Sequence, residues 1–229
     1  MSFLDNLLDE TKAAQFVEQN TEAWHQIRLG RFTASEIYRL MSLPKAEHAR
    51  KAGKLSEAGY SYVLEKVAET LTGQPKQQGY AFPLVWGMEH EAEAVEFFES
   101  KTGKQTTQTG FYPYTDHAGG SPDREVGDDE ILEIKCPYDS ARQIDYLMLT
   151  TESDLKAEFP QYYWQCQANL LFTGRSVCHF ATFDPRMKDN EYKMAHLEVR
   201  KNEADQQFII DRIAKAIEEK LKVLTALKP

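Results

Sequence analysis

The sequence predicts an α/β protein in which a central mixed sheet is flanked by helices. Segments with the apolar spacing of helices alternate along the chain with short runs typical of strands. The chain has 229 residues, 41% of them hydrophobic, and contains no internal repeat, low-complexity tract or flexible linker. Such a chain can build one full hydrophobic core. We therefore expect a single domain that covers residues 1–229.

The composition indicates a soluble protein of the cytoplasm. Its apolar runs are far shorter than a membrane span, and the segment from Met1 to Thr11 alternates acids with leucines. Cys136, Cys166 and Cys178 are widely spaced and form no Cys-x-x-Cys pair, which argues against a zinc site, an iron–sulfur cluster or a disulfide framework.

The net charge of −9 argues against a protein that simply coats nucleic acid. One segment, residues 42–55, departs from this acidic balance and is predicted to be a basic loop. Its basic residues are Lys45, His48, Arg50, Lys51 and Lys54. A local surface for DNA and a solvated basic loop account for it equally well.

Several segments have the apolar spacing or the end signals of helices. They are residues 4–19, 21–30, 33–41, 56–71, 83–102, 139–149, 158–173 and 203–226. Thr21 is expected to cap the second helix and Gly30 to end it, while Thr33 and Glu36 predict a capping box for the third. The expected buried side of the helix of residues 56–71 consists of Tyr60, Val63, Leu64 and Val67.

Strands are predicted between these helices. Residues 105–114 indicate one or two strands, followed by a hairpin at Gly119-Gly120 and a strand from Ile131 to Cys136. Two further strands, residues 176–183 and 192–199, are joined by a turn region at residues 184–186. The alternating side chains of a strand place Glu133 and Lys135 on one face of the chain.

Asp123, Glu133 and Lys135 form the strongest chemical pattern in the sequence. Asp123 precedes Glu133 by ten positions, and the turn residues 127–129 between them allow a bent hairpin that brings the two carboxylates together. Other Glu-x-Lys pairs occur in this highly charged chain, but only this one has such an aspartate. Two carboxylates and a lysine suit a metal-dependent hydrolytic site.

A second polar group lies near the predicted start of the helix of residues 33–41. Arg28 and Arg31 precede this helix, and Thr33 and Ser35 add hydroxyl groups. Free backbone N–H groups, the helix dipole and an arginine fork together suit a phosphate group. Caps and surface arginines are common, so the pattern alone is a weak signal.

Several motifs in the same order resemble the lambda exonuclease family, also described as YqaJ-like viral recombinases, within the PD-(D/E)xK nuclease superfamily. The shared pieces are Ala23-Trp24-His25-x-x-Arg28-Leu29-Gly30, Thr33-Ala34-Ser35-Glu36, Trp86-Gly87-x-x-x-Glu91, Ser121-Pro122-Asp123, Glu133-x-Lys135-Cys136-Pro137, Gln165-x-Gln167 and Asp184-Pro185-Arg186-Met187-Lys188. The resemblance implies one nuclease domain, residues 1–229, with a restriction-endonuclease-like PD-(D/E)xK core.

The resemblance also implies roles for individual residues. Asp123 and Glu133 would be metal ligands, Lys135 the catalytic lysine and Glu91 a further acidic ligand. The residues implied around the 5′-phosphate are Arg28, Ser35, Ser121 and Gln165, and Leu84 would lie where the strands separate. Without the resemblance, Glu91 is best interpreted as a solvated helix residue, and Gln165 faces a site or solvent with equal ease.

The carboxylates, with the carbonyl oxygen of Ile134, offer hard oxygen ligands suited to Mg²⁺, for which Mn²⁺ can substitute. Lys135 is then a general base or an electrostatic helper, and both roles stay open. The resemblance implies a double-stranded DNA exonuclease that works from 5′ ends and leaves 3′ overhangs. It also implies a homotrimer that works with a single-strand annealing recombinase.

Two alternatives remain from the sequence. A PD-(D/E)xK endonuclease that cuts DNA internally would use the same carboxylates, although it would have no use for a pocket that holds a strand terminus. A DNA-end or protein-binding module with a decayed site is the other alternative, and the intact Asp123, Glu133 and Lys135 argue against it.

Overall fold

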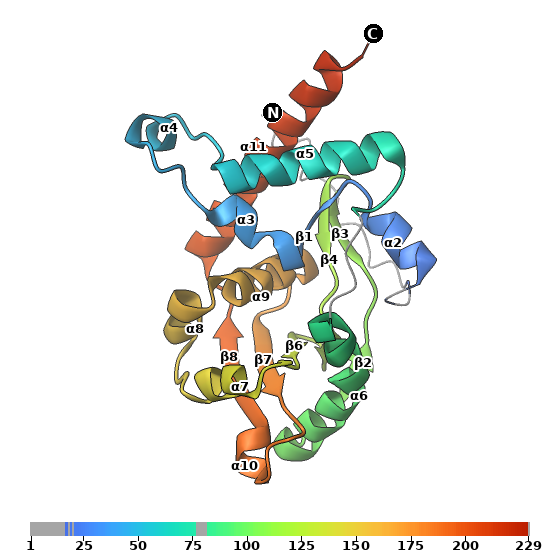
Figure 1. Cartoon of the computed structure of the whole chain (residues 1–229), viewed down its shortest axis with the longest axis vertical. Helices are drawn as coiled ribbons and strands as arrows, with labels where there is room; N and C mark the ends of the chain where they lie inside the picture. Colours follow the sequence, from blue (N-terminus) through green and yellow to red (C-terminus); the bar gives the residue numbers. More distant parts are fainter. Residues whose placement is uncertain (1–16, 18, 20, 77–81, 229) are drawn as a thin grey trace.

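A mixed sheet forms the centre of the computed structural model, which describes residues 17, 19, 21–76 and 82–228 (Figure 1). Five strands pair in the order β2-β5-β6-β7-β8, and three short strands form a second sheet in the order β1-β4-β3. The strands are β1 (Phe32–Thr33), β2 (Thr106–Gln108), β3 (Tyr112–Thr115), β4 (Ala118–Gly120), β5 (Arg124–Val126), β6 (Glu130–Lys135), β7 (Val177–Phe183) and β8 (Met194–Arg200). The helix expected at residues 4–19 lies almost entirely outside the described residues.

β6 is the central strand of the larger sheet. It pairs antiparallel with β5 and parallel with β7, which makes the sheet mixed as predicted. Ile131 packs into one hydrophobic cluster, and Leu132 and Ile134 pack into another on the opposite face. The alternation of side chains is therefore as predicted, but both faces of the strand are buried.

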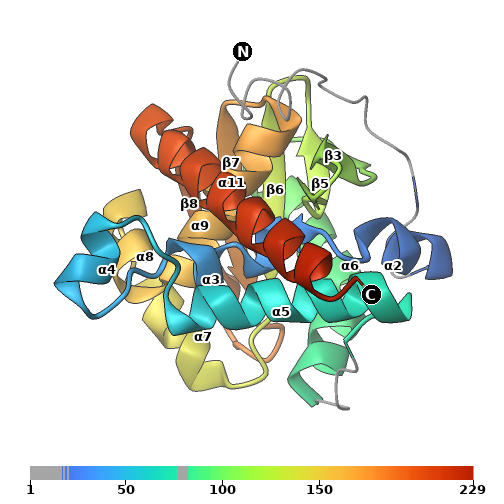
Figure 2. The same ribbon diagram turned by 90° about the horizontal axis from the view of Figure 1, so that it is seen from above.

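Helices cover both faces of this sheet, which confirms the predicted fold class. They are α2 (Glu22–Arg28), the 3₁₀ helix η1 (Ala34–Glu36), α3 (Tyr38–Met41), α4 (Glu47–Lys51), α5 (Glu57–Thr72), α6 (Phe82–Thr102), α7 (Ser140–Leu147), α8 (Glu152–Glu158), α9 (Pro160–Thr173), α10 (Asn190–Lys193) and α11 (Glu203–Ala226). α6 packs against β6 and β7 from one side, and α9 packs against β7 and β8. α5 and α11 pack across each other (Figure 2), and α11 also packs against α3 and α9.

The cap residues explain where several helices begin and end. The Thr21 hydroxyl accepts a hydrogen bond from the backbone N–H of Trp24, and Ser56 caps α5 in the same way. Gly73 and Gly174 adopt left-handed conformations after α5 and α9, which favours glycine at both positions. The apolar spacing did not predict α4, which lies in the predicted basic loop, or α8 and α10. α10 includes the first two residues of the strand predicted at residues 192–199, which begins instead at Met194. No helix in the described ranges is long and apolar enough to cross a membrane.

The predicted capping box at Thr33 and Glu36 is wrong. Thr33 makes no capping hydrogen bond, and the chain enters the 3₁₀ helix η1 instead of an α-helix. The Thr33 hydroxyl lies 3.3 Å from Ser35 Oγ, and the backbone N–H of Thr33 donates to the hydroxyl of Tyr62 at 2.9 Å. Tertiary contacts with α5 therefore replace the local cap.

The predicted buried side of α5 is half wrong. Val63 and Val67 are buried, but Tyr60 and Leu64 are each 42% exposed, and Tyr62 is buried in their place. The buried face is completed by Lys66 and Glu69, whose side chains form an ion pair with Nζ to Oε1 at 2.9 Å.

Candidate active site

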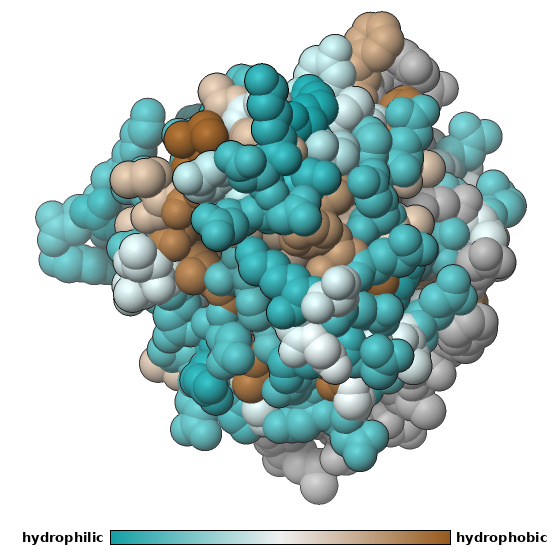
Figure 3. Space-filling model, turned by 90° about the horizontal axis from the view of Figure 1, so that it is seen from below, coloured by the Kyte–Doolittle hydropathy of each residue, from teal (hydrophilic) through white to brown (hydrophobic). Residues whose placement is uncertain are grey.

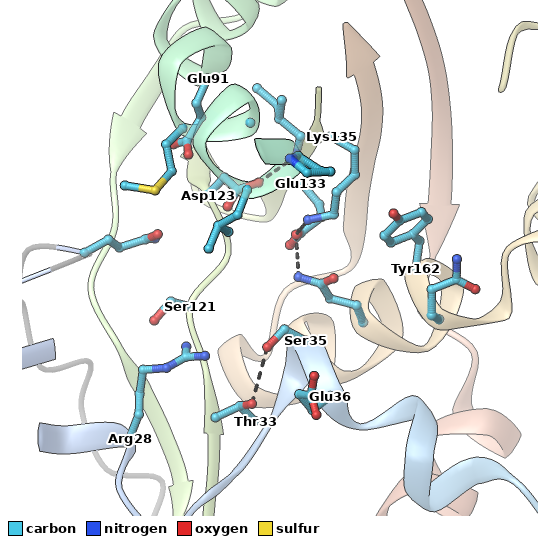
Figure 4. A pocket seen from close by; sticks show the side chains of 18 of the residues that line it. Arg28, Thr33, Ser35, Glu36, Glu91, Ser121, Asp123, Glu133, Lys135 and Tyr162 are labelled. Atoms are coloured by element: carbon cyan, nitrogen blue, oxygen red, sulfur yellow. Dashed lines mark hydrogen bonds and ion pairs between the residues drawn. The ribbon is translucent and has the colours of Figure 1, made fainter. Parts of the chain in front are cut away.

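One cleft of about 1650 Å³ holds every residue predicted to act in the reaction or in substrate binding. The residues that line it include Lys135, Glu133, Asp123, Glu91, Ile134, Arg28, Ser35, Ser121, Gln165 and Leu84. The close-up shows the carboxylates and Lys135 on one side of this space and Arg28, Ser35 and Ser121 on another (Figure 4). The surface turned toward the viewer in Figure 3 is mainly hydrophilic, with apolar side chains showing between the polar ones.

Asp123 lies beside the end of β6. Its backbone N–H donates to the carbonyl of Leu132 at 3.1 Å, and its Oδ2 accepts a hydrogen bond from the backbone N–H of Ile134 at 2.6 Å. The bent hairpin predicted from the turn residues 127–129 therefore brings Asp123 to the strand that carries Glu133. In a strand, the N–H and the carbonyl of one residue face the same edge, so the Ile134 carbonyl also faces Asp123.

Glu133 is fully buried, and three side chains donate to its carboxylate. Lys135 Nζ lies 2.5 Å from Oε1, Gln165 Nε2 also donates to Oε1, and Asn169 Nδ2 donates to Oε2 at 3.0 Å. Burial and the nearby charge of Asp123 raise the pKa of Glu133 above its ordinary value, and the adjacent ammonium of Lys135 opposes this shift.

Lys135 is held as an ammonium group in this arrangement. Burial by itself would lower its pKa, but the charges of Glu133 and Asp123 outweigh burial and raise the pKa above its ordinary value. The ammonium thus places a positive charge among the carboxylates of the cleft.

Glu91 faces the site instead of solvent. Its Oε1 lies 3.4 Å from a guanidinium nitrogen of Arg124, which also donates to the Asp123 carbonyl at 2.7 Å. Burial and the charge of Asp123 raise the pKa of Glu91. The helix α6 therefore brings a third carboxylate to the cleft.

The donor set fits a hard divalent cation. Glu91, Asp123 and Glu133 offer carboxylate oxygens, and the Ile134 carbonyl is a fourth oxygen on the same edge of β6. Within the described residues, no three His, Cys, Asp or Glu side chains lie close enough together to hold a metal ion. Like charges repel, and each of these carboxylates instead accepts a hydrogen bond from a protein donor. In this structure the three carboxylates therefore stand apart, each bound to its own protein donor.

Arg28 stands at the end of α2 and has no carboxylate partner within residues 21–76 and 82–228. Its guanidinium carbon lies 3.9 Å from the centroid of the Trp24 ring, and the guanidinium forms no hydrogen bond or ion pair with another described residue. Burial lowers its pKa to about 10, so the group stays charged at neutral pH. Ser35 and Ser121 point into the same part of the cleft (Figure 4). A charged arginine beside two hydroxyl groups suits an anion.

Gln165 and Leu84 occupy different parts of the cleft wall. Gln165 is 7% exposed, and its amide donates to Glu133, so in this structure it serves the carboxylate. Leu84 lies in the first turn of α6 and is 51% exposed, and Met88 one turn later is 52% exposed. The basic segment of residues 45–54 is not among the lining residues, and α4 projects away from the body of the protein (Figure 1).

Three site residues were missed from the sequence. Asn169 lies one helical turn after Gln165, which was the only signal for it. Trp24 supports Arg28, and its Nε1 donates to Ser121 Oγ at 3.2 Å. Nothing in the sequence pattern indicated that Arg124 would contact Glu91.

The mixed sheet with Asp123, Glu133 and Lys135 at the end of its central strands has the PD-(D/E)xK nuclease fold. The chain belongs to the family of YqaJ-like viral recombinase domains, whose model matches residues 23–176. The resemblance seen in the sequence is therefore confirmed.

Solved structures agree with this assignment. An alkaline exonuclease, LHK-Exo from Laribacter hongkongensis, is 26% identical, with a TM-score of 0.75 over 90% of this chain and 96% of that chain. The same enzyme has been solved in complex with dAMP. A phage related exonuclease from Haemophilus somnus 129PT is 16% identical, with a TM-score of 0.74 over 86% of this chain and 96% of that one, and shows the shared fold. No match was found among curated proteins. Family and fold together support assignment of the chain to the nucleases.

Proposed function

We propose that this protein is a Mg²⁺-dependent exonuclease that degrades one strand of duplex DNA from its 5′ end and leaves a 3′ single-stranded overhang. The observation that carries the proposal is the shared cleft. It contains a carboxylate and lysine cluster and, in another part, a charged arginine that has no hydrogen-bond acceptor among the described residues. An enzyme that cuts inside a strand has no need for such an anion pocket, because it never holds a terminus.

The Arg28 region is suited to a terminal phosphate. Such a group carries close to two negative charges, and Arg28 with the Ser35 and Ser121 hydroxyls offers a cation and two donors. The solved complex of LHK-Exo with dAMP supports this proposal, because dAMP is a nucleoside 5′-phosphate. A 5′-terminal nucleotide released by hydrolysis leaves the strand in that chemical form.

The carboxylate cluster is suited to the hydrolysis itself. A water oxygen attacks the phosphorus of the first internucleotide phosphate, the bond from phosphorus to the 3′ oxygen of the terminal nucleotide breaks, and that oxygen takes up a proton. When bound, Mg²⁺ or Mn²⁺ supplies Lewis acidity and lowers the pKa of water. Asp123, Glu133 and Glu91, with the Ile134 carbonyl, would hold the cation. Lys135 bears a charge that stabilises the phosphate in the transition state or orients the water.

Two further features of this proposal extend beyond the cleft chemistry. The exposed Leu84 and Met88 provide an apolar surface on the first turns of α6, which is suited to unstacking the bases where the strands separate. A homotrimer and a single-strand annealing recombinase as partner are proposed from the family resemblance. Light scattering tests the trimer, and a monomeric mass would contradict it.

The discriminating experiment compares a linear duplex with a covalently closed circle of the same sequence in Mg²⁺. We expect digestion of the linear form, its loss in the presence of a chelator, and an intact circle. Cutting of the circle at a comparable rate would support an internal endonuclease, and no digestion of either form would support a binding module.

A further inference from the structure

Gly120 was predicted to lie in a hairpin turn, but it is a residue of strand β4, and the turn between β3 and β4 lies at residues 116–117. It is tightly packed against α9. A Cβ atom on Gly120 would lie 2.4 Å from Asn169 Oδ1 and 2.9 Å from the Cβ of Ala34. Contacts that short do not occur between such atoms, so the backbone of β4 approaches Asn169 as closely as only glycine permits. The Asn169 side chain is therefore held from one side by the main chain of β4.

The other side of Asn169 faces Glu133. Asn169 is fully buried, and its Nδ2 donates to Glu133 Oε2 at 3.0 Å, while its Oδ1 has no hydrogen-bond partner among the described residues. A buried carbonyl oxygen without a partner is unfavourable, and an apolar side chain of similar size would avoid that cost. Among the described residues, the Asn169 side chain therefore makes a hydrogen bond through its N–H donor but not through its carbonyl oxygen.

The three donors to Glu133 divide its carboxylate unequally. Lys135 and Gln165 both donate to Oε1, and Asn169 alone donates to Oε2. The two donors to Oε1 fix the position of that oxygen, but the carboxylate can still rotate about it and move Oε2. A donor on the second oxygen fixes the plane of the group. An ionised carboxylate has about four acceptor positions, so the remaining one lies on Oε2.

We propose that Asn169 is a positioning residue that fixes Oε2 of Glu133 for one divalent cation. This inference rests on the proposed function, because it assumes that Glu133 is a metal ligand. Loss of such an orienting partner typically weakens metal binding or activity about tenfold to a hundredfold. Asn169 itself does not contact the substrate or the cation in this scheme.

Gln167 provides a matched control on the same helix. It is also fully buried, its Nε2 donates to the Arg200 carbonyl at 2.7 Å, and its Oε1 accepts from the backbone N–H of Asn202 at 3.0 Å. Gln167→Leu thus removes buried amide hydrogen bonds from α9 without touching Glu133. Asn169→Leu removes the hydrogen bond to Glu133 and keeps a side chain of similar size.

The test measures Mn²⁺ binding to the full chain without DNA, by calorimetry, in the wild type and both variants. We expect Asn169→Leu to bind Mn²⁺ about tenfold to a hundredfold more weakly, and Gln167→Leu to bind it like the wild type. On linear duplex, kcat of Asn169→Leu at a fixed Mn²⁺ concentration should fall while KM for DNA stays unchanged. Asn169→Ala is measured in parallel, because the leucine variant alone is not decisive if it fails to fold.

Equal Mn²⁺ affinities for the wild type and a folded Asn169 variant would overturn the proposal. So would equal losses in the Asn169 and Gln167 variants, or a wild-type chain that binds no Mn²⁺. Because the binding measurement contains no DNA, it is independent of the proposed exonuclease activity. A chain whose Mn²⁺ affinity depends on Asn169 but that leaves DNA intact would refute the proposed function and support this inference.

Discussion

The guanidinium of Arg28 lies over the indole ring of Trp24, with its carbon 3.9 Å from the ring centroid. The Nε1 of the same ring donates to Ser121 Oγ at 3.2 Å. One side chain thus supports two residues of the proposed phosphate pocket. A cation held over an aromatic face keeps its N–H groups free to donate to an anion.

Arg28→Ala should abolish the preference for phosphorylated 5′ ends. Losing a charged contact in a partly buried pocket costs about 2 to 4 kcal/mol, a factor of roughly thirty to nearly a thousand in rate. Cleavage of 5′-phosphorylated duplex should fall by that factor, and the slow cleavage of 5′-hydroxyl duplex should barely change. Initial rates on the two duplexes provide the measurement. A variant that keeps the wild-type preference would make Arg28 an ordinary surface arginine.

Substitutions of Trp24 should weaken the same preference in two steps. Trp24→Phe keeps an aromatic face for Arg28 and loses only the hydrogen bond to Ser121, whereas Trp24→Leu loses both contacts. We expect a loss of about threefold to tenfold for Trp24→Phe and a larger loss for Trp24→Leu. The ratio of the rates on 5′-phosphorylated and 5′-hydroxyl duplex measures this preference in each variant. Equal ratios in both variants and the wild type would mean that Trp24 only fills space.

Substitutions in the carboxylate cluster should remove activity and leave the fold intact. Asp123→Ala and Glu133→Ala each remove a proposed metal ligand, and Lys135→Ala removes the positive charge beside Glu133. Each should slow digestion of linear duplex by several orders of magnitude, or roughly 4 kcal/mol and more. Glu96→Ala, at an exposed position of α6, serves as the control. Wild-type rates in any of the three variants, with far-UV circular dichroism unchanged, would move the site elsewhere.

Lys220 should make stability rise with pH in the alkaline range. It is 3% exposed and donates to the Gly30 carbonyl at 2.7 Å, and burial together with the charge of Lys66 lowers its pKa to about 8. Lysine in the unfolded chain has a pKa of about 10.4. Between the folded-state pKa and this unfolded-state pKa, the unfolded state binds more protons, so the free energy of unfolding increases with pH.

The gain in stability from deprotonation of Lys220 is absent below its pKa in the folded state and complete above its pKa in the unfolded state. We expect the wild type to gain up to about 3 kcal/mol relative to Lys220→Met over this range, because the variant lacks the titrating group. Urea denaturation of both proteins at about pH 7.5 and about pH 10 measures the difference. A difference that is the same at both pH values would show that Lys220 does not titrate there.

Local patterns predicted the parts of the site that lie close together in the chain. The turn between Asp123 and Glu133 was visible as Gly127 and two aspartates, and β-strand alternation placed Glu133 and Lys135 on one face. The grouping of Arg28 with Ser35 also came from adjacent helix ends. These relations depend on chain geometry over a few residues, which sequence patterns describe well.

Relations set by tertiary packing were missed or wrong. Tyr60 and Leu64 were expected in the core because apolar spacing cannot detect a buried ion pair. The buried face of α5 carries Lys66 and Glu69, and the latter accepts a hydrogen bond from the backbone N–H of Gly30 at 2.9 Å. The contact between Asn169 and Glu133 likewise joins α9 to β6, two elements far apart in sequence.

The central claim is that the cleft removes nucleotides from a 5′-phosphorylated end. The most direct measurement uses a linear duplex with one label in the 5′-terminal nucleotide and a different label in the 3′-terminal nucleotide of the same strand, digested in Mg²⁺. We predict early release of the 5′ label as a deoxynucleoside 5′-monophosphate while the 3′ label remains on long fragments. Release of the 3′ label first, or of the 5′ label only on oligonucleotides, would contradict the account.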